Sequence, residues 1–404
     1  MTLYSGEFAA DPHGAYRDMR RHHGSLVPVE VAPGVPATLV IGYREALHVL
    51  GDPRHFPADP RVWQSTVPAD CPVLSMMEWQ PNASRTAGEE HARYRRANTD
   101  SLDKIDLYAL RGAVERTAAA LIDSFCESGS ADLLSQYAVP LTAQVLNDLL
   151  GFSQEAGEEA FAALVTLRNA DDAASAEAGH RMFTSAMLEV ISAKREAPAT
   201  DVTSWLLEHP SALDEAEMVQ QMAMLYVTGT EPTSNLIVNT LLLMATDDRF
   251  GSELLAGALS TRDAIDEVLF TDPPLANSCF SYPRQPQILG DVLLPMHEPV
   301  VISLAACNND PAAVNGDRTG NRSHLAWGAG PHACPAKSLA MVIVQEALDQ
   351  LLDALPEIRL AVPAEQLQWR QGGFHRALET LPVIFPPSPP LPNGARVTVG
   401  IGNE

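Results

Sequence analysis

The sequence predicts an α-rich α+β fold in one large domain, and three observations support this prediction. Apolar residues recur at three- and four-residue spacing over most of residues 91–255, which is typical of packed helices. Short β-rich runs occur near both ends of the chain. The 404 residues are 46% hydrophobic, which is enough for a large buried core.

The predicted elements follow from these patterns in chain order. Strands over residues 26–31 and 37–41 form a hairpin, and a helix over 43–50 ends at a Gly-Asp-Pro turn. A buried strand is expected over 300–306. Residues 1–385 are expected to form the domain, and the Pro- and Gly-rich residues 386–404 a mobile tail. Further helices are predicted over residues 110–125, 141–150, 158–167, 180–194, 215–245 and 335–355.

Composition excludes several classes of protein. A formal net charge of −24 argues against nucleic-acid binding, which needs surplus Lys and Arg. The five cysteines form no C-x-x-C pair, so we expect thiols of a reducing cytosol instead of a disulfide or zinc framework. We find no signal peptide and no apolar run of roughly 18 residues. A cytoplasmic protein without a membrane span is therefore expected.

The segment 327–336, Trp-Gly-Ala-Gly-Pro-His-Ala-Cys-Pro-Ala, carries the most chemical information. Its two glycines permit a tight turn with positive φ, so that backbone N–H groups converge on one atom. Cys334 precedes Pro335, at the predicted start of a helix, where the helix dipole lowers a thiol pKa. Haem iron binds the thiolate form. A lone cysteine is more often a small buried hydrophobe, and the other four cysteines keep that interpretation.

This segment resembles the haem-binding signature of the cytochrome P-450 superfamily, of the soluble bacterial type. Trp327 stands where Phe is usual, Gly328 matches the first glycine, and Ala336 replaces a glycine two residues after the cysteine. The resemblance extends over roughly residues 11–385. It implies one haem b (heme b, iron protoporphyrin IX) with Cys334 as the axial thiolate ligand.

The resemblance also implies which residues hold the haem propionates. His91 and Arg95 match the family's His-x-x-x-Arg helix and lie one turn apart, on the same helix face. His332 would be a third propionate contact. The alternative is that all three are charges on a solvated surface.

The long apolar helix predicted over 215–245 contains a polar cluster at residues 228–235. Here the family places an acid followed by an alcohol, which pass protons toward the haem. Glu231 fills the acid position, but the alcohol position is Pro232. We hypothesise that Thr228 or Thr233 supplies the missing hydroxyl through a water molecule. The alternative is that these hydroxyls only cap a helix broken by proline.

Two arginines of the family are missing from this sequence. The family's Glu-x-x-Arg is represented by Glu267 and Phe270, as in an actinobacterial branch that lacks the arginine. We expect Glu267 to pair with Arg318 and Phe270 to pack among apolar neighbours. The arginine that follows the family's Pro-Pro motif falls on Ser281, and Arg284 is a speculative replacement.

Three functions remain open. The first is a haem-thiolate monooxygenase that inserts one oxygen atom from O2 into an apolar small molecule, with electrons from a ferredoxin and its reductase. The second is a peroxide-dependent haem-thiolate oxidase, since Pro232 removes a hydroxyl. The third is a degenerate haem-binding sensor or scaffold. The substrate pocket is expected at residues 62–78, 226–230, 275–280 and 372–375. A basic patch formed by Arg93, Arg96, Lys104 and Lys337 would dock an acidic ferredoxin, or would be a solvated face of mixed charge.

Overall fold

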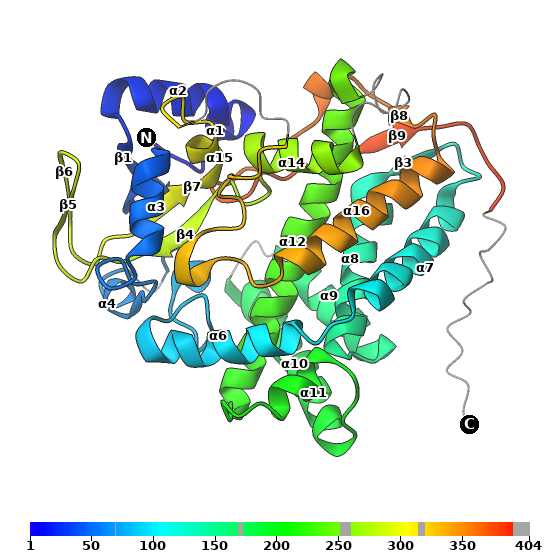
Figure 1. The fold of residues 1–404 in the computed structure, drawn as a ribbon, viewed down its shortest axis with the longest axis horizontal. Helices are drawn as coiled ribbons and strands as arrows, with labels where there is room; N and C mark the ends of the chain where they lie inside the picture. Colours follow the sequence, from blue (N-terminus) through cyan, green and yellow to red (C-terminus); the bar gives the residue numbers. More distant parts are fainter. Residues whose placement is uncertain (69, 169–172, 251–259, 314–319, 391–404) are drawn as a thin grey trace.

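A helical region lies beside a smaller region built on a β-sheet (Figure 1). The computed structural model describes residues 1–68, 70–168, 173–250, 260–313 and 320–390. The predicted α-rich α+β fold is confirmed. The helices are α1 (Gly6–Ala10), α2 (Pro12–His23), α3 (Tyr43–Gly51), α4 (Arg61–Gln64), α5 (Leu74–Met77), α6 (Gly88–Leu102), α7 (Leu107–Phe125), α8 (Val139–Leu150), α9 (Gln154–Arg168), α10 (Ala173–Glu196), α11 (Val202–Leu207), α12 (Glu215–Thr246), α14 (Thr261–Thr271), α15 (Leu304–Asn308) and α16 (Lys337–Ala354). Three short turns of other helix types are η1 (Leu134–Ala138), η2 (Gly330–His332) and η3 (Ala364–Gln366).

The main sheet has four strands in the order β1-β2-β7-β4. Strands β1 and β2 form the predicted antiparallel hairpin, and β7 adds to β2 in parallel, with Thr38 opposite Val300. Because side chains alternate along a strand, Val27 and Val29 pack toward α2 while Leu26 packs toward α3. The strands of the structure are β1 (Leu26–Ala32), β2 (Val35–Val40), β3 (Ser130–Asp132), β4 (Asn277–Ser281), β5 (Gln287–Leu289), β6 (Val292–Leu294), β7 (Val300–Ser303), β8 (Arg359–Leu360) and β9 (Pro382–Ile384).

Helix α12 is the long helix in the middle of the helical region (Figure 1). A capping box formed by Asp214 and Glu217 starts it, which satisfies free N–H groups of its first turn. It packs against α8, α10, α14 and α16 and continues through Pro232. A buried hydrogen bond of 2.6 Å between the hydroxyls of Ser234 and Thr142 joins it to α8. The predicted buried helix is therefore confirmed.

The structure corrects the ends of several predicted elements. Residues 304–306, predicted as strand, begin α15 because the Ser303 side chain caps the helix at Ala306 N. Helix α16 begins at Lys337, two residues after the predicted start at Pro335. Most of the predicted tail, residues 391–404, lies outside the described residues. Among the helices that are described, none is both long enough and apolar enough to cross a bilayer.

The predicted ion pair between Glu267 and Arg318 stays a prediction. Arg318 lies outside the described residues, and Glu267 is half-buried with Arg249 Nη2 at 3.8 Å. The neighbouring acid Asp266 is buried and lies 2.7 Å from Arg322 Nε. Sequence reasoning missed this pair because it compared only the family's motif positions.

Phe270 occupies the position of the missing arginine and is 1% exposed. Its nearest described aromatic partner is the imidazole of His324, which meets the ring edge-on at 5.2 Å between centroids. A large ring thus fills the space on α14 where the family carries a charge.

Replacing Phe270 with Ala is expected to lower the free energy of unfolding by about 3–5 kcal/mol, because a buried ring is removed and a cavity remains. Urea unfolding of the apo-protein, followed by circular dichroism, measures the change. Tyr108→Ala on α7 is the matched control, since Tyr108 is 85% exposed. Equal losses in the two variants would contradict a packing role for Phe270.

Candidate active site

The loop before α16 folds tightly around Cys334. Gly328 and Gly330 have φ values of 67° and 66°, which confirms the predicted positive-φ turn. A Cβ atom on Gly330 would lie 2.1 Å from Leu50 O, so no other residue fits there without displacing α3. The Cys334 N–H donates to Trp327 O at 2.8 Å and closes the loop.

The electrostatic state of Cys334 differs from the prediction. Burial raises the pKa of the thiol, against the opposing effects of the Ala336 N–H and the charges of Arg95 and Lys337. The predicted lowering of the pKa is therefore wrong, because α16 begins three residues after the cysteine and desolvation dominates. A thiol in this position becomes a thiolate when a metal ion binds it.

The structure brings the three predicted propionate residues together beside this loop. The rings of His91, from α6, and His332, from η2, lie 4.0 Å apart between centroids. Arg95, one turn after His91, donates from Nη2 to the carbonyl oxygen of Ala333. Residues far apart in sequence thus converge on one side of Cys334.

Two observations test whether a haem fits this cluster. His91 Nε2 and Trp327 Nε1 are buried and have no hydrogen-bond partner among the described residues. Burial lowers the pKa of His91, and it lowers the pKa of His332 to about 4, so both imidazoles are neutral near pH 7. Buried donors without a partner, one arginine and one half-buried thiol match a cofactor that presents carboxylates and a metal. The residues present therefore fit the haem that the resemblance implies.

A cavity of about 1040 Å³ opens along one face of α12. Thr228 and Glu231 line it, whereas Thr233 is 6% exposed and is not among the described residues that line it. Of the predicted pocket segments, residues 75–76, 227–228 and 230 contribute, whereas none of the lining residues comes from 275–280 or 372–375. Helices α9 and α10 contribute a wall that the sequence did not indicate, including Phe161, Leu164, Val165, His180, Phe183 and Thr184.

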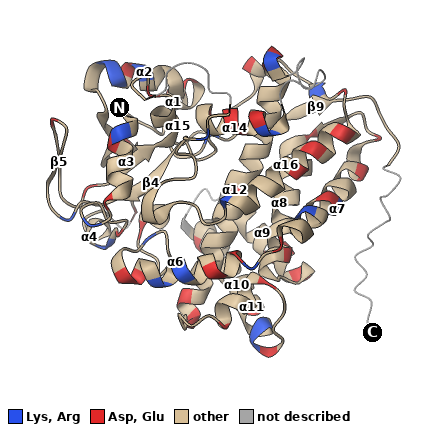
Figure 2. Ribbon diagram, in the orientation of Figure 1, with Lys and Arg blue, Asp and Glu red and all other residues tan. Residues whose placement is uncertain are grey.

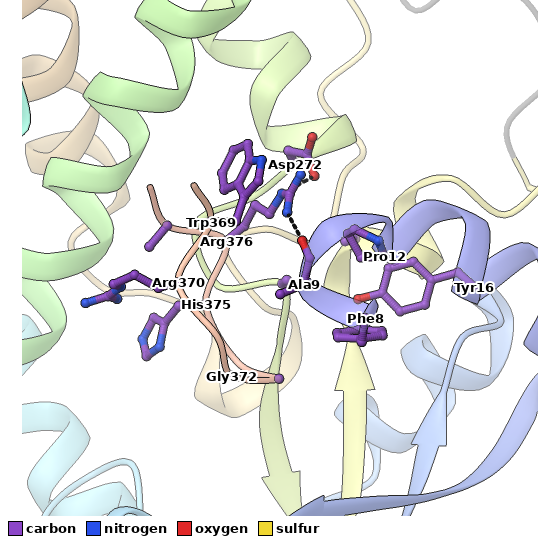
Figure 3. Close-up of a pocket in the computed structure, with 14 residues that line it drawn as sticks. Phe8, Ala9, Pro12, Tyr16, Asp272, Trp369, Arg370, Gly372, His375 and Arg376 are labelled. Carbon is purple, nitrogen blue, oxygen red and sulfur yellow. Dashed lines mark hydrogen bonds and ion pairs between the residues drawn. The ribbon is translucent and has the colours of Figure 1, made fainter. Parts of the chain in front are cut away.

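Glu231, on the wall of this cavity, is held by Arg370 and lies near the ring of His375. Arg370 Nη2 donates to Glu231 Oε1, and His375 Nε2 lies 3.9 Å from Glu231 Oε2. Figure 3 shows Arg370 and His375 projecting to one side of their segment, while Arg376 projects to the other, toward Asp272. There Arg376 Nε lies 3.3 Å from Asp272 Oδ1. Arg370 was missed by sequence reasoning because no motif marks it.

The expected basic patch is only partly free. Arg93 pairs with Glu217, and Lys104 lies over the Trp205 ring at 5.6 Å from its centroid. Arg96 and Lys337 are exposed. Figure 2 shows acidic residues toward both ends of α6 and basic residues between them. The predicted docking surface therefore has fewer cations without a described partner than the sequence indicated, and it stays a prediction.

Comparison with known proteins gives consistent results in sequence and structure, although no family model matches the chain. Cytochrome P-450 107B1 of Saccharopolyspora erythraea is 28% identical over 411 residues, covering 95% of this chain and 97% of the relative. The cytochrome P-450 monooxygenase PikC of Streptomyces venezuelae is 28% identical over 391 residues, covering 93% and 92%. The solved structure of CYP154C4 from a Streptomyces species has a TM-score of 0.87 at 25% identity, covering 95% of this chain and 98% of that one. CYP154A1 from Streptomyces coelicolor has a TM-score of 0.83 at 26% identity, covering 93% and 98%.

Gly330→Ala is expected to lower the free energy of unfolding more than Gly290→Ala does. The methyl group added at position 330 would collide with the carbonyl oxygen of Leu50, whereas the one added at position 290 would not. Gly290 also has positive φ, at 57°, but its Cβ would meet no atom within 4 Å. The common cost of the left-handed conformation is about 1 kcal/mol, and the clash adds about 1–3 kcal/mol. Urea midpoints of the two apo-proteins measure this difference, and equal midpoints would contradict the close approach.

Proposed function

The chain belongs to the cytochrome P-450 superfamily, and we propose that it inserts one oxygen atom from O2 into an apolar small molecule. It is a monooxygenase, and its cofactor is haem b held through a cysteine thiolate. In the proposed reaction a substrate C–H bond becomes C–O–H, and the second oxygen atom leaves as water. Two electrons and two protons complete the balance, and the electrons come from a ferredoxin-type partner.

Cys334 is the proposed axial ligand, and His91, Arg95 and His332 bind the propionates. The observation that carries this assignment is the convergence of the two imidazoles, 4.0 Å apart, beside the cysteine loop. When bound, the haem supplies oxygen activation and transfer, which no side chain provides. Trp327 and Gly328 shape the loop, and the Ala336 N–H donates to the sulfur.

Protons would reach the haem along the α12 face that carries Glu231 and Thr228. Both side chains line the cavity, and Thr228 Oγ1 donates to Met224 O at 2.7 Å, which leaves its oxygen able to accept from water. Thr233 is buried outside this wall, so we assign the relay hydroxyl to Thr228. The hydrogen bond from Arg370 fixes the position of the Glu231 carboxylate on the same helix face as the Thr228 hydroxyl.

The cavity supports a sizeable apolar substrate. Its volume of about 1040 Å³ and its lining by Met76, Phe161, Leu164 and Phe183 favour a molecule larger than a simple alkane. Similar relatives include a 6-deoxyerythronolide B hydroxylase and a vitamin D(3) 25-hydroxylase. Exposed Arg96 and Lys337, near the cysteine loop, support docking of an acidic redox partner.

A peroxide-dependent reaction is the second candidate, and Pro232 favours it. Proline removes the hydroxyl that the family places after the acid, and helix α12 continues without it. Peroxide brings its own protons and electrons, so a weak relay would matter less.

Cys334→Ala is expected to abolish the red-shifted Soret band of the ferrous carbon-monoxide complex, because a thiolate ligand gives that band. The difference spectrum of purified wild-type and variant proteins measures it, with Cys279→Ala as control. A wild-type spectrum typical of histidine or neutral-thiol ligation, or lacking haem, would sink the proposal and favour the sensor or scaffold interpretation.

Thr228→Ala is expected to lower product formed per NADPH by at least about tenfold, because a positioned proton donor contributes roughly 100-fold or more. Peroxide-driven turnover should change little. Thr233→Ala is the matched control and should keep coupling. Unchanged coupling in both variants would refute the relay, and wild-type turnover with peroxide but not with NADPH and a reductase would favour the second candidate.

A further inference from the structure

Arg85, on the cavity wall, carries a positive charge that no carboxylate of the described residues balances as an ion pair. Its guanidinium donates from Nη2 to Met76 O and lies 5.7 Å from the centroid of the Phe280 ring. Burial lowers the pKa of Arg85, and neither of the described acids that act on it, Tyr282 and Glu78, forms an ion pair with it. Arg85 is half-buried and faces the cavity, so its charge is partly desolvated and is stabilised by an accompanying anion. The described residues leave that anion to be supplied from outside the chain.

The backbone around Arg85 is fixed against the haem-binding cluster. The His332 ring makes a hydrogen bond with the backbone of Ala83. On the other side, Gln221 of α12 accepts from Ala83 N at 3.4 Å and donates to Pro81 O at 2.8 Å. Arg85 therefore lies two residues after Ala83, which contacts His332, one of the predicted propionate residues.

The guanidinium reaches the stretch of β4 that lacks the family's arginine. Ser281, where that arginine falls, is buried and its Oγ has no partner among the described residues. The register of β4 against β7 shifts between Ser278 and Ser281, and Cys279 has a positive φ of 57°. Phe280, before Ser281, lies beneath Arg85. The cation beside this part of β4 is therefore Arg85, which comes from the segment before α6, and not an arginine on β4 itself.

Counting charges gives the partner. Haem b carries two negatively charged propionates, whereas Arg95 is the one permanently charged residue among the three proposed anchors. We propose that Arg85 binds a haem propionate and takes the place of the arginine that the family carries on β4. The inference deepens the proposed function and rests on haem binding at Cys334. Charge-assisted hydrogen bonds between Arg and carboxylate are strong and directional, so Arg85 would hold the porphyrin edge in place.

The test measures haem loss from ferric wild-type protein, Arg85→Gln and Arg85→Lys, with excess apomyoglobin as acceptor. Arg85→Gln is expected to lose haem about tenfold faster, equivalent to about 1.4 kcal/mol, and Arg85→Lys less so. Arg17→Gln on α2 is the matched control, because Arg17 is exposed and belongs to neither the cavity wall nor the haem-binding cluster, so it should leave the rate unchanged. Each protein is also reconstituted with haem dimethyl ester, in which the propionates are uncharged, and there all rates should converge.

Each contrary outcome has a separate meaning. Equal haem loss from wild-type and Arg85→Gln with native haem would overturn the inference while leaving the proposed function intact. A difference that persists with the ester, or a lower urea midpoint of the apo-variant that accounts for it, would assign Arg85 to folding. A third outcome concerns the haem spin state, which changes when a substrate binds. If Arg85→Gln loses haem at the wild-type rate and its spin state responds to the methyl esters of long-chain carboxylic acids but not to the free acids, the anion that Arg85 binds is a substrate carboxylate and the inference is overturned. A wild-type protein that takes up no haem would overturn the proposed function as well.

Discussion

Cys334 is half-buried, and burial raises the pKa of its thiol because a negative charge on the sulfur costs more free energy there than in water. The loop and the residues around Cys334 either reduce this free-energy cost or hold the loop in place. The glycine turn brings the Ala336 N–H onto the sulfur, and Arg95 adds a positive charge from α6. Gly330 lets the loop sit directly on the backbone of α3. The raised pKa keeps the thiol protonated in the apo-protein, and in the proposed function the haem iron meets the remaining cost of the thiolate.

Much of the site could be predicted because its signals are local. The loop glycines, the one-turn spacing of His91 and Arg95, and the polar cluster on an apolar helix are readable within ten residues of sequence. The long helices were predicted for the same reason, since their apolar periodicity is an internal property. Their ends were less certain because single side chains such as Ser303 and Asp106 set them.

The parts that the sequence did not reveal are produced by contacts between distant segments. Arg370 meets Glu231 across 139 positions, and neither segment contains a motif that specifies the pairing. The raised pKa of Cys334 follows from burial by the whole fold, whereas a helix-terminus argument considers only its neighbours. The Asp266–Arg322 ion pair was not predicted for a different reason: comparison with the family's motif considers Glu267 and not its neighbour Asp266. The family resemblance directed attention to the loop of Cys334 and gave no indication of Arg85.

The charged wall of the cavity is secured by the first helices of the chain. Arg376 Nη1 donates to Ala9 O at 2.8 Å over a separation of 367 positions, and this contact fixes the segment that also carries Arg370 and His375. Contacts of such high contact order form slowly, because a long loop must close before they stabilise the chain. We therefore expect the helical region to become ordered early in folding and Glu231 to acquire its partners last. During synthesis on the ribosome, Glu231 would remain without Arg370 until almost the whole chain has emerged.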